Sequence, residues 1–339
     1  LEAIATHGRD VYYRGAVAEQ IAGYFAKEGG LITQEDLAAH EGEWVKPLSV
    51  PFAGLDLLEL PPNTQGITAL QMLGMLNDLP LGASPTDALT VHTAVEVKKL
   101  AFADRDKYLT DAAHMRVNPE SLLAPSYLRK RGALVDAHTA MASIAPGSFA
   151  GDTTYMCAAD GDGNACSLIQ SNFRGFGSGH VVTGTGISLQ NRGSYFSLDP
   201  ERANALAPNK RTLHTLIPSM ALRDGKLAIV FGAMGGDGQA QTHTQVYTAL
   251  ARFGLNIQAA IEMPRWVHGA ELPGEGEVLR IEDRYSRDTL AALAALGHRV
   301  VPVGPWESVM GHASGIVLDP SGVLHGGADP RSEGAAVGW

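Results

Sequence analysis

The chain has no excess of basic residues: 26 Lys and Arg stand against 36 Asp and Glu, which gives a formal net charge of −10. A nucleic-acid groove or an anionic membrane surface requires clustered Lys and Arg, so we expect neither nucleic acid nor membrane as a partner. The chain also has no run of 18 apolar residues, which excludes a membrane-spanning helix. What remains is 339 residues of ordinary globular composition, 45% hydrophobic and 18% charged, enough for a large core.

Signals for metal sites and disulfides are equally scarce. Cys157 and Cys166 are the only cysteines, and they face each other if a hairpin turns at Gly161-Asp162. We expect two small buried thiols, with their pairing left open. The twelve histidines form no H-x-x-x-H pair with an acidic neighbour, so we expect no metal ion and no cofactor. Asp160-Gly161-Asp162-Gly163-Asn164 lacks the Gly and Glu positions of a calcium loop and indicates a hairpin turn instead.

The first residues, Leu1 to His7, carry no basic and apolar signal region. A cytoplasmic location is therefore slightly favoured over a periplasmic one. The start also lacks Met, so we expect that upstream sequence has been removed or lies on another chain.

The first half of the chain is predicted to be mainly helical. Apolar spacing and breaker residues indicate helices at residues 10–28, 67–78, 85–108 and 119–132. Thr33-Gln34-Glu35-Asp36 is typical of a capping box that opens a short helix. Residues 55–60 alternate like a strand, which the turn Pro61-Pro62-Asn63-Thr64-Gln65-Gly66 ends.

The second half is predicted to consist of short strands joined by Asp-Gly turns. Such turns occur at residues 160–164, 223–226 and 319–322, and helices fit residues 239–253 and 287–296. Between the strand 227–231 and the helix that follows lies Gly232-Ala233-Met234-Gly235-Gly236-Asp237-Gly238. A glycine pair there aims backbone N–H groups outward and can hold an oxyanion, although the pattern alone favours a plain turn.

The chemistry is predicted at Gly151-Asp152-Thr153-Thr154-Tyr155, where a tether of small, polar and breaking residues (140–150) meets a strand. An N-terminal Thr can be nucleophile and base together, because its α-amine, with an ordinary pKa of about 8, can accept the hydroxyl proton. The layout is the one expected if the peptide bond before Thr153 is cut. No G-x-S-x-G elbow offers a competing serine nucleophile.

Taken together, these segments resemble the γ-glutamyltranspeptidase family of N-terminal nucleophile hydrolases, and the resemblance covers nearly all 339 residues. The matching segments are Gly29-Gly30-Leu31-Ile32-Thr33-Gln34-Glu35-Asp36-Leu37-Ala38, Pro61-Pro62, Gly151-Asp152-Thr153-Thr154, Phe176-Gly177-Ser178-Gly179, Pro208-Asn209-Lys210-Arg211, Met234-Gly235-Gly236 and Gly327-Ala328-Asp329-Pro330-Arg331-Ser332.

The resemblance implies an α+β fold, the four-layer αββα sandwich, made as a precursor that cuts itself between Asp152 and Thr153. Residues 1–152 would then be the C-terminal part of the large (α) subunit, and residues 153–339 the small (β) subunit. The two would associate as one αββα domain, from which an upstream segment is missing. A homodimer is left open.

The resemblance also implies roles for single residues. Thr153 matches the nucleophile, Gly235 and Gly236 match the oxyanion-hole glycines, and Ser171 stands where the family has a supporting Thr hydroxyl. No cofactor is implied.

The departures from the family pattern fall on substrate recognition. Phe173 and Tyr195 stand where the transpeptidases bind the glutamyl α-amino group with Asn and Asp, and His214-Thr215 replaces a pair of serines. The Arg that clamps the α-carboxylate would lie upstream of Leu1. The lid, residues 197–207, is shortened.

This pattern is more similar to the amidases and acylases of the family, among them oxamate amidohydrolases and cephalosporin or glutaryl acylases. Arg192 and Arg174 become candidate binders of a substrate carboxylate, because a guanidinium matches a carboxylate with two hydrogen bonds. The alternative is that each Arg forms a structural ion pair. The other predicted substrate-binding residues are Asn191, His214, Thr215 and Tyr195.

The predicted function is thus a self-cleaving threonine amidohydrolase or acyltransferase that acts on a small amide bearing a carboxylate. Two alternatives stay open: a true γ-glutamyltransferase that cleaves glutathione, and a non-catalytic or truncated relative that is only a folded scaffold.

Overall fold

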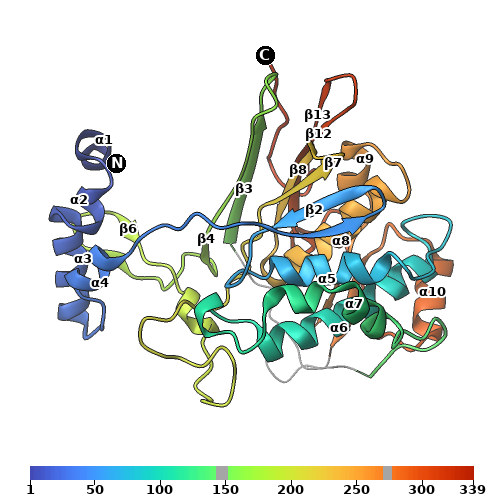
Figure 1. Cartoon of the computed structure of the whole chain (residues 1–339), viewed down its shortest axis with the longest axis horizontal. Helices are drawn as coiled ribbons and strands as arrows, with labels where there is room; N and C mark the ends of the chain where they lie inside the picture. The colour runs from blue at the N-terminus through green and yellow to red at the C-terminus, as the bar shows by residue number, and fades with distance from the viewer. Residues whose placement is uncertain (143–151, 270–276) are drawn as a thin grey trace. The chain divides into compact units, whose positions relative to one another are not determined.

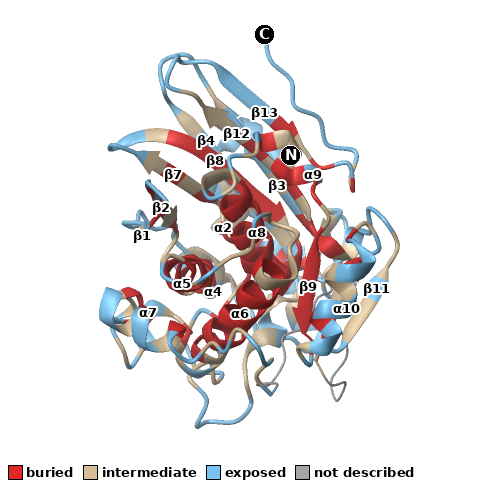
Figure 2. Cartoon of the chain, turned by 90° about the vertical axis from the view of Figure 1, so that its right-hand side faces the viewer, coloured by how far each residue is buried: buried red, intermediate tan, exposed pale blue. Residues whose placement is uncertain are grey.

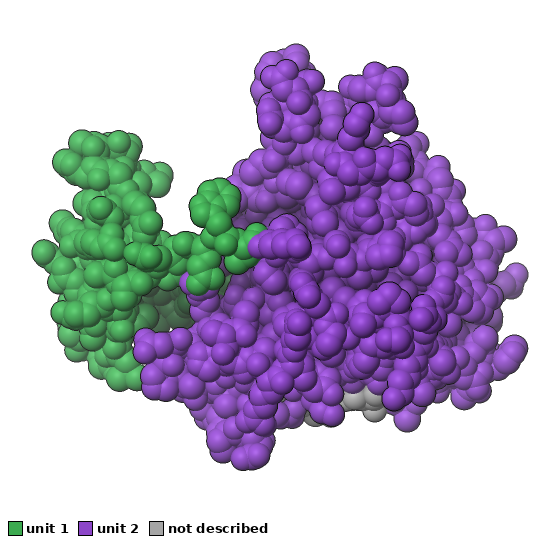
Figure 3. Space-filling view, in the orientation of Figure 1, with its two compact units in different colours: residues 1–45, 172–191 green, residues 46–171, 192–339 purple. Residues whose placement is uncertain are grey.

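The computed structural model describes residues 1–142, 152–269 and 277–339. Most of the predicted tether lies outside these ranges. The chain divides into two compact units, of which unit 1 comprises Leu1–Val45 and Asn172–Asn191, and unit 2 comprises Lys46–Ser171 and Arg192–Trp339 (Figure 3). These units do not follow the predicted boundary between Asp152 and Thr153. That boundary concerns cleavage and stays a prediction.

Unit 1 holds short helices and a small strand pair. Its elements are α1 (Glu2–His7), α2 (Asp10–Tyr13), α3 (Ala16–Glu28), α4 (Gln34–Ala39), β5 (Val181–Val182) and β6 (Ile187–Ser188). The prediction of one helix over 10–28 is wrong, because Gly15 is extended and separates α2 from α3. The capping box is confirmed: Thr33 Oγ1 accepts from the Asp36 N–H, and the Asp36 carboxylate accepts from the Thr33 N–H.

Unit 2 is built on a six-stranded antiparallel sheet in the order β1-β2-β7-β8-β12-β13 (Figure 1). Its strands are β1 (Leu48–Phe52), β2 (Leu55–Glu59), β7 (Ser219–Arg223), β8 (Lys226–Met234), β12 (His312–Leu318) and β13 (Leu324–Ala328). The predicted Asp-Gly hairpins are confirmed. Between β7 and β8, Asp224 and Gly225 both have positive φ, 51° and 74°, as the favoured two-residue hairpin turn requires.

Helices cover the sheet and carry most of the buried residues. Helix α5 (Gly66–Leu76) and helix α8 (Gln239–Ala251) pack on the sheet, and α6 (Ala88–Tyr108) packs on α5. Every residue of α5 is buried, and Figure 2 shows α5, α6 and α8 mostly in the colour of buried residues. The predicted helix at 119–132 is instead a 3-10 turn (Pro119–Leu123) followed by α7 (Pro125–Gly132), because Pro125 starts a new helix.

The remaining elements lie around this core. They are the 3-10 turns Ala112–His114, Arg192–Tyr195, Gly236–Gly238 and Ser308–Met310, the helices α9 (Ile257–Glu262) and α10 (Arg287–Ala295), and a three-stranded sheet of β11 (Val300–Val303), β10 (Val278–Glu282) and β9 (Trp266–Gly269).

The predicted hairpin is formed by β3 (Asp152–Ala159) and β4 (Ala165–Phe173), and β3 packs against β8 and β12 of the large sheet. Helices, the six-stranded sheet and this hairpin are successive layers, so the predicted α+β class is confirmed. Strand β4 alternates half-buried and exposed residues. Cys166 of β4 is exposed and Cys157 of β3 is half-buried, both as free thiols, so the prediction of two buried thiols is wrong for Cys166 and only partly met by Cys157.

In the described part of the chain, no helix is both long enough and apolar enough to cross a bilayer.

Candidate active site

The predicted nucleophile and its predicted support are in contact. Thr153, the second residue of β3, is only 8% exposed, and its Oγ1 donates a hydrogen bond to Ser171 Oγ at 3.0 Å. Ser171 lies near the end of β4, so the β3–β4 hairpin brings together two residues that are 18 apart in the chain. A second hydrogen bond, 2.8 Å long, joins the hydroxyls of Tyr155 and Ser167 across the same pair of strands.

Tyr155 also fixes β3 on the large sheet. A Cβ built on Gly232 of β8 would overlap the Tyr155 ring, so only glycine allows this close approach. Thr153 and Tyr155 share one face of β3, because side chains alternate along a strand. The strand that carries Thr153 is therefore held on the strand that leads to Gly235.

Directly after β8, the predicted strand–turn–helix arrangement around Gly235 and Gly236 is present. Gly235 and Gly236 have φ of 152° and 54°, values that strongly favour glycine, and the 3-10 turn Gly236–Gly238 leads into α8. Within the described residues, neither the Gly235 N–H nor the Gly236 N–H donates to another group. Two backbone donors ahead of a helix are suited to hold an oxyanion.

A buried ion pair includes Asp237, the middle residue of this turn. Arg105 Nη1 of α6 donates to Asp237 Oδ1 at 2.6 Å, and Tyr195 Oη donates to the same oxygen at 2.6 Å. Burial, and then the Asp237 charge, raise the pKa of Tyr195 well above its ordinary value, so the phenol stays a neutral donor. Tyr195 is predicted from the sequence to lie at the substrate, whereas the parts played by Arg105 and Asp237 are not. The only signal in the sequence was Arg105, a charged residue within the predicted helix 85–108, and the structure shows that its side chain is buried.

Two of the predicted substrate-binding residues contact each other beside this cluster. Arg192 Nη1 donates to Thr215 Oγ1 at 3.0 Å, and its guanidinium carbon lies 5.7 Å from the centre of the Tyr195 ring. Arg192 is half-buried, and this burial lowers the pKa of its guanidinium. Burial, together with the charges of Arg192 and Arg211, lowers the pKa of His214 to about 4, so His214 is neutral at pH 7.

Arg174 and Asn191 belong to unit 1. The Arg174 N–H donates to Asn191 Oδ1 at 3.1 Å, and the Arg174 guanidinium lies 5.0 Å from the Phe173 ring. Their role at a substrate stays a prediction.

One group of described residues has the donor set of a metal site: His92, Glu96 and His298, all buried, with ligand atoms within 4.8 Å of one another. Spacing analysis missed it because His298 comes from a distant segment. Lys99 Nζ donates to Glu96 Oε1 at 2.7 Å, and His92 Nδ1 lies 2.7 Å from His298 Nε2. A lysine ammonium already neutralises the carboxylate, so we interpret this group as a hydrogen-bonded network. The prediction of no metal stays untested.

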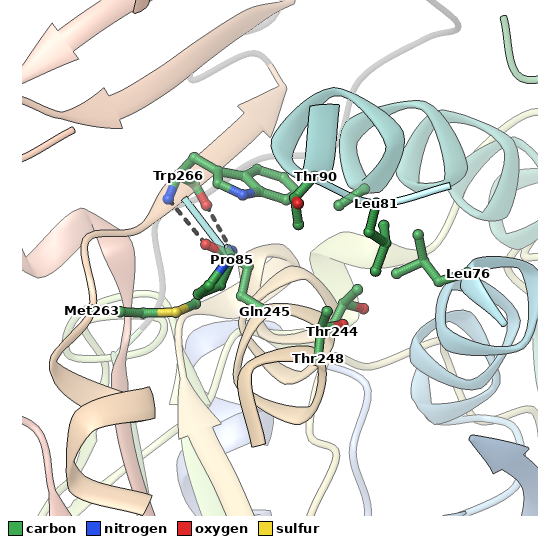
Figure 4. Close-up of a pocket in the computed structure, with 10 residues that line it drawn as sticks. Leu76, Leu81, Pro85, Thr90, Thr244, Gln245, Thr248, Met263 and Trp266 are labelled. Atoms are coloured by element: carbon green, nitrogen blue, oxygen red, sulfur yellow. Dashed lines mark hydrogen bonds between the residues drawn. The ribbon is translucent and has the colours of Figure 1, made fainter. Parts of the chain in front are cut away.

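A small pocket lies apart from these residues, between α5, α6 and α8 (Figure 4). Leu76, Thr90 and Trp266 are among its lining residues, and none of the candidate catalytic residues is. Figure 4 also shows Gln245, whose amide bonds the backbone of Trp266.

Comparisons with known proteins give one matching family and several relatives. The family described as Gamma-glutamyltranspeptidase matches residues 1–339. The Glutathione hydrolase-like YwrD proenzyme of Bacillus subtilis is 41% identical over 100% of the chain. The Oxamate amidohydrolase proenzyme of Klebsiella pneumoniae is 42% identical, also over 100% of the chain. The chain spans 64% of the length of each of these relatives.

Among solved structures, the cephalosporin acylase from Bacillus halodurans superposes with a TM-score of 0.91 at 40% identity. The match covers 100% of this chain and 61% of that one. The α+β fold is thus the fold of this group of N-terminal nucleophile hydrolases.

Proposed function

Because this chain belongs to the γ-glutamyltranspeptidase family, we propose that it is a self-cleaving threonine amidohydrolase for a small amide that bears a carboxylate. The observation that carries the proposal is the contact between Thr153 Oγ1 and Ser171 Oγ, because β3 packs against β8, the strand that leads to Gly235 and Gly236. A nucleophile with a supporting hydroxyl and a pair of backbone donors are the parts that acyl transfer requires.

The proposed reaction begins after cleavage between Asp152 and Thr153 has freed the Thr153 α-amine. The hydroxyl attacks the amide carbonyl and gives its proton to that amine, while the N–H groups of Gly235 and Gly236 bind the oxyanion. The C–N bond then breaks, and the proton leaves with the amine product. Water attacks the resulting ester, releases the carboxylic acid and restores the threonine hydroxyl.

Arg192 is the proposed binder of the substrate carboxylate. It is partly shielded from water, and its partner Thr215 connects through Gln65 to the carbonyl of Gly236. Phe173 offers no charge for an α-amino group, and the Tyr195 hydroxyl is bonded to Asp237. The names of the two relatives, an oxamate amidohydrolase and a glutathione hydrolase-like protein, support an amide substrate and keep γ-glutamyl transfer as the second candidate.

Denaturing mass analysis of the wild type and of Thr153→Ala tests the cleavage. The wild type should give two pieces, the second of which begins at Thr153, and Thr153→Ala should stay one chain. If the wild type stays uncut under all conditions, or is cut elsewhere, Thr153 is not the nucleophile.

A substrate panel then tests the acyl group. Oxamate or a glutaryl amide should be hydrolysed in preference to a γ-glutamyl anilide. Efficient γ-glutamyl transfer to dipeptides would contradict the interpretation of Phe173 and Tyr195 and would support the second candidate.

A further inference from the structure

We infer that Gln65 is a positioning residue. It connects residues 235–238, the oxyanion turn, to residues 212–215, the substrate-binding segment, and this role rests on the proposed function. Gln65 precedes α5 and is fully buried. It belongs to the Pro61–Gly66 turn, to which the reaction described above gives no part.

The side-chain amide of Gln65 joins three separate parts of unit 2. Its Nε2 donates to the carbonyl oxygen of Gly236 at 3.1 Å and to that of Thr215 at 3.2 Å. Its Oε1 accepts from Arg105 Nη1 at 3.1 Å. Gly236, Thr215 and Arg105 lie 171, 150 and 40 residues away from Gln65 in the chain. One buried amide therefore joins segments that are distant in sequence.

The backbone around Gln65 supports the same junction. The turn lies parallel to residues 212–215: Asn63 Nδ2 donates to the Thr212 carbonyl, the His214 N–H to the Asn63 carbonyl, and the Gln65 N–H to the His214 carbonyl. The segment that carries Thr215 is therefore held along its length. Because Thr215 Oγ1 accepts from Arg192, this pairing also sets where the guanidinium lies.

The glycine turn needs such a support because glycine does not fix its own backbone. With φ of 54° and no side chain, Gly236 depends on its neighbours for the orientation of its peptide groups. Gln65 holds the Gly236 carbonyl, and Arg105 holds the next residue, Asp237, while donating to Gln65 as well. The two contacts lock consecutive residues of the turn.

Only an amide fits all three partners. Two carbonyl oxygens require a donor and the guanidinium requires an acceptor. A carboxylate would repel both carbonyl oxygens, and a methionine has no donor for them and only a weak acceptor for the guanidinium. Misplacement of catalytic groups by about 1 Å can reduce rates about 100-fold.

Gln65→Met tests the inference, with Gln245→Met as the matched control. Gln245 is also buried, its Nε2 donates to the carbonyl oxygens of Gln241 and Trp266, and its Oε1 accepts from the Trp266 N–H. Both variants lose two donated bonds and one accepted bond. Only Gln65→Met should lower kcat, by about 10- to 100-fold, and raise KM for a glutaryl amide more than for the uncharged butyryl amide.

Hydrogen exchange gives a readout that does not need activity. Gln65→Met should speed exchange at residues 212–216 and 235–239, whereas Gln245→Met should do so near residue 266 and leave those two segments unchanged. Equal exchange of residues 212–216 and 235–239 in wild type and Gln65→Met would overturn the inference, as would equal kcat losses in the two variants. If exchange changes as expected but the wild type hydrolyses no amide, Gln65 holds the turn and the proposed function fails.

Discussion

Single side chains at the candidate site fall into those that can react and those that hold them. Thr153 offers its hydroxyl to Ser171, and Gly235 and Gly236 offer backbone N–H groups. Tyr195 belongs to the second kind, because its hydroxyl is bonded to Asp237. In this structure Tyr195 therefore supports Asp237, the residue after Gly236, and its part in substrate recognition stays a prediction.

Arg192→Met separates recognition from structure. Loss of a charge-assisted contact worth about 1.5–3 kcal/mol should raise KM for a glutaryl amide about 10- to 100-fold, with kcat nearly unchanged. The butyryl amide, which has no carboxylate, serves as the control and should keep its KM. Were Arg192 only a structural ion-pair partner, the melting temperature would fall while both KM values stayed the same.

Among the secondary-structure elements, the contact between β3 and β8 sets the position of Thr153, the proposed nucleophile. The Tyr155 ring rests on Gly232, and Tyr155 is further bonded to Ser167 of β4. The oxyanion turn follows the end of β8. One glycine thus sets the spacing between the strand that carries Thr153 and the strand that leads to Gly235.

Gly232→Ala should push the Tyr155 ring away, lower the free energy of unfolding by about 1–3 kcal/mol and slow self-cleavage. Urea unfolding and the time course of cleavage by mass analysis measure the two effects. Gly161→Ala is the control, because a Cβ at this hairpin residue meets no atom within 4 Å. A Gly232→Ala protein that is as stable and as quickly cleaved as the wild type would contradict the role of this contact.

For the whole molecule, the buried titratable groups set the dependence of stability on pH. Burial lowers the pKa of His243 and of His298 to about 3, and that of His214 to about 4. His268 and His312 shift in the same direction. Glu59, bonded to His243, shifts the other way, because burial raises its pKa well above the ordinary value.

These shifts predict that the protein loses stability in mild acid. Below pH 6.5 the histidines of the unfolded chain bind protons, whereas those of the folded protein stay neutral because their pKa values are lowered. The free energy of unfolding therefore falls as pH falls. Glu59 offsets at most about one proton above pH 4.5, because its pKa is raised in the folded state, and several histidines remain. The slope should exceed about 1.4 kcal/mol per pH unit, the value for one net proton. Urea unfolding of the uncleaved Thr153→Ala protein at pH 6.5, 5.5 and 4.5 measures it, and a constant or rising value would contradict the prediction.

The features that could be predicted from the sequence are those that depend on residues close together in the chain. The Asp-Gly hairpins and the Thr33–Asp36 capping box follow from local backbone preference and strand periodicity. The pairing of Thr153 with Ser171 was implied by the family resemblance, and one hairpin brings the two hydroxyls together. Local signals failed where one residue changed the backbone, as Gly15 and Pro125 did when they split predicted helices.

Contacts between side chains that are distant in the sequence could be seen only in the folded structure. The motif Gly327-Ala328-Asp329-Pro330-Arg331-Ser332 was visible in the sequence, but its reason is that buried Asp329 pairs with Arg265 and Arg331. The hydrogen bond from Gln65 to the Gly236 carbonyl likewise could not be predicted from the spacing of these residues in the sequence. A buried polar group must find a partner wherever packing places one, so such pairs are set by the folded core rather than by separation along the chain.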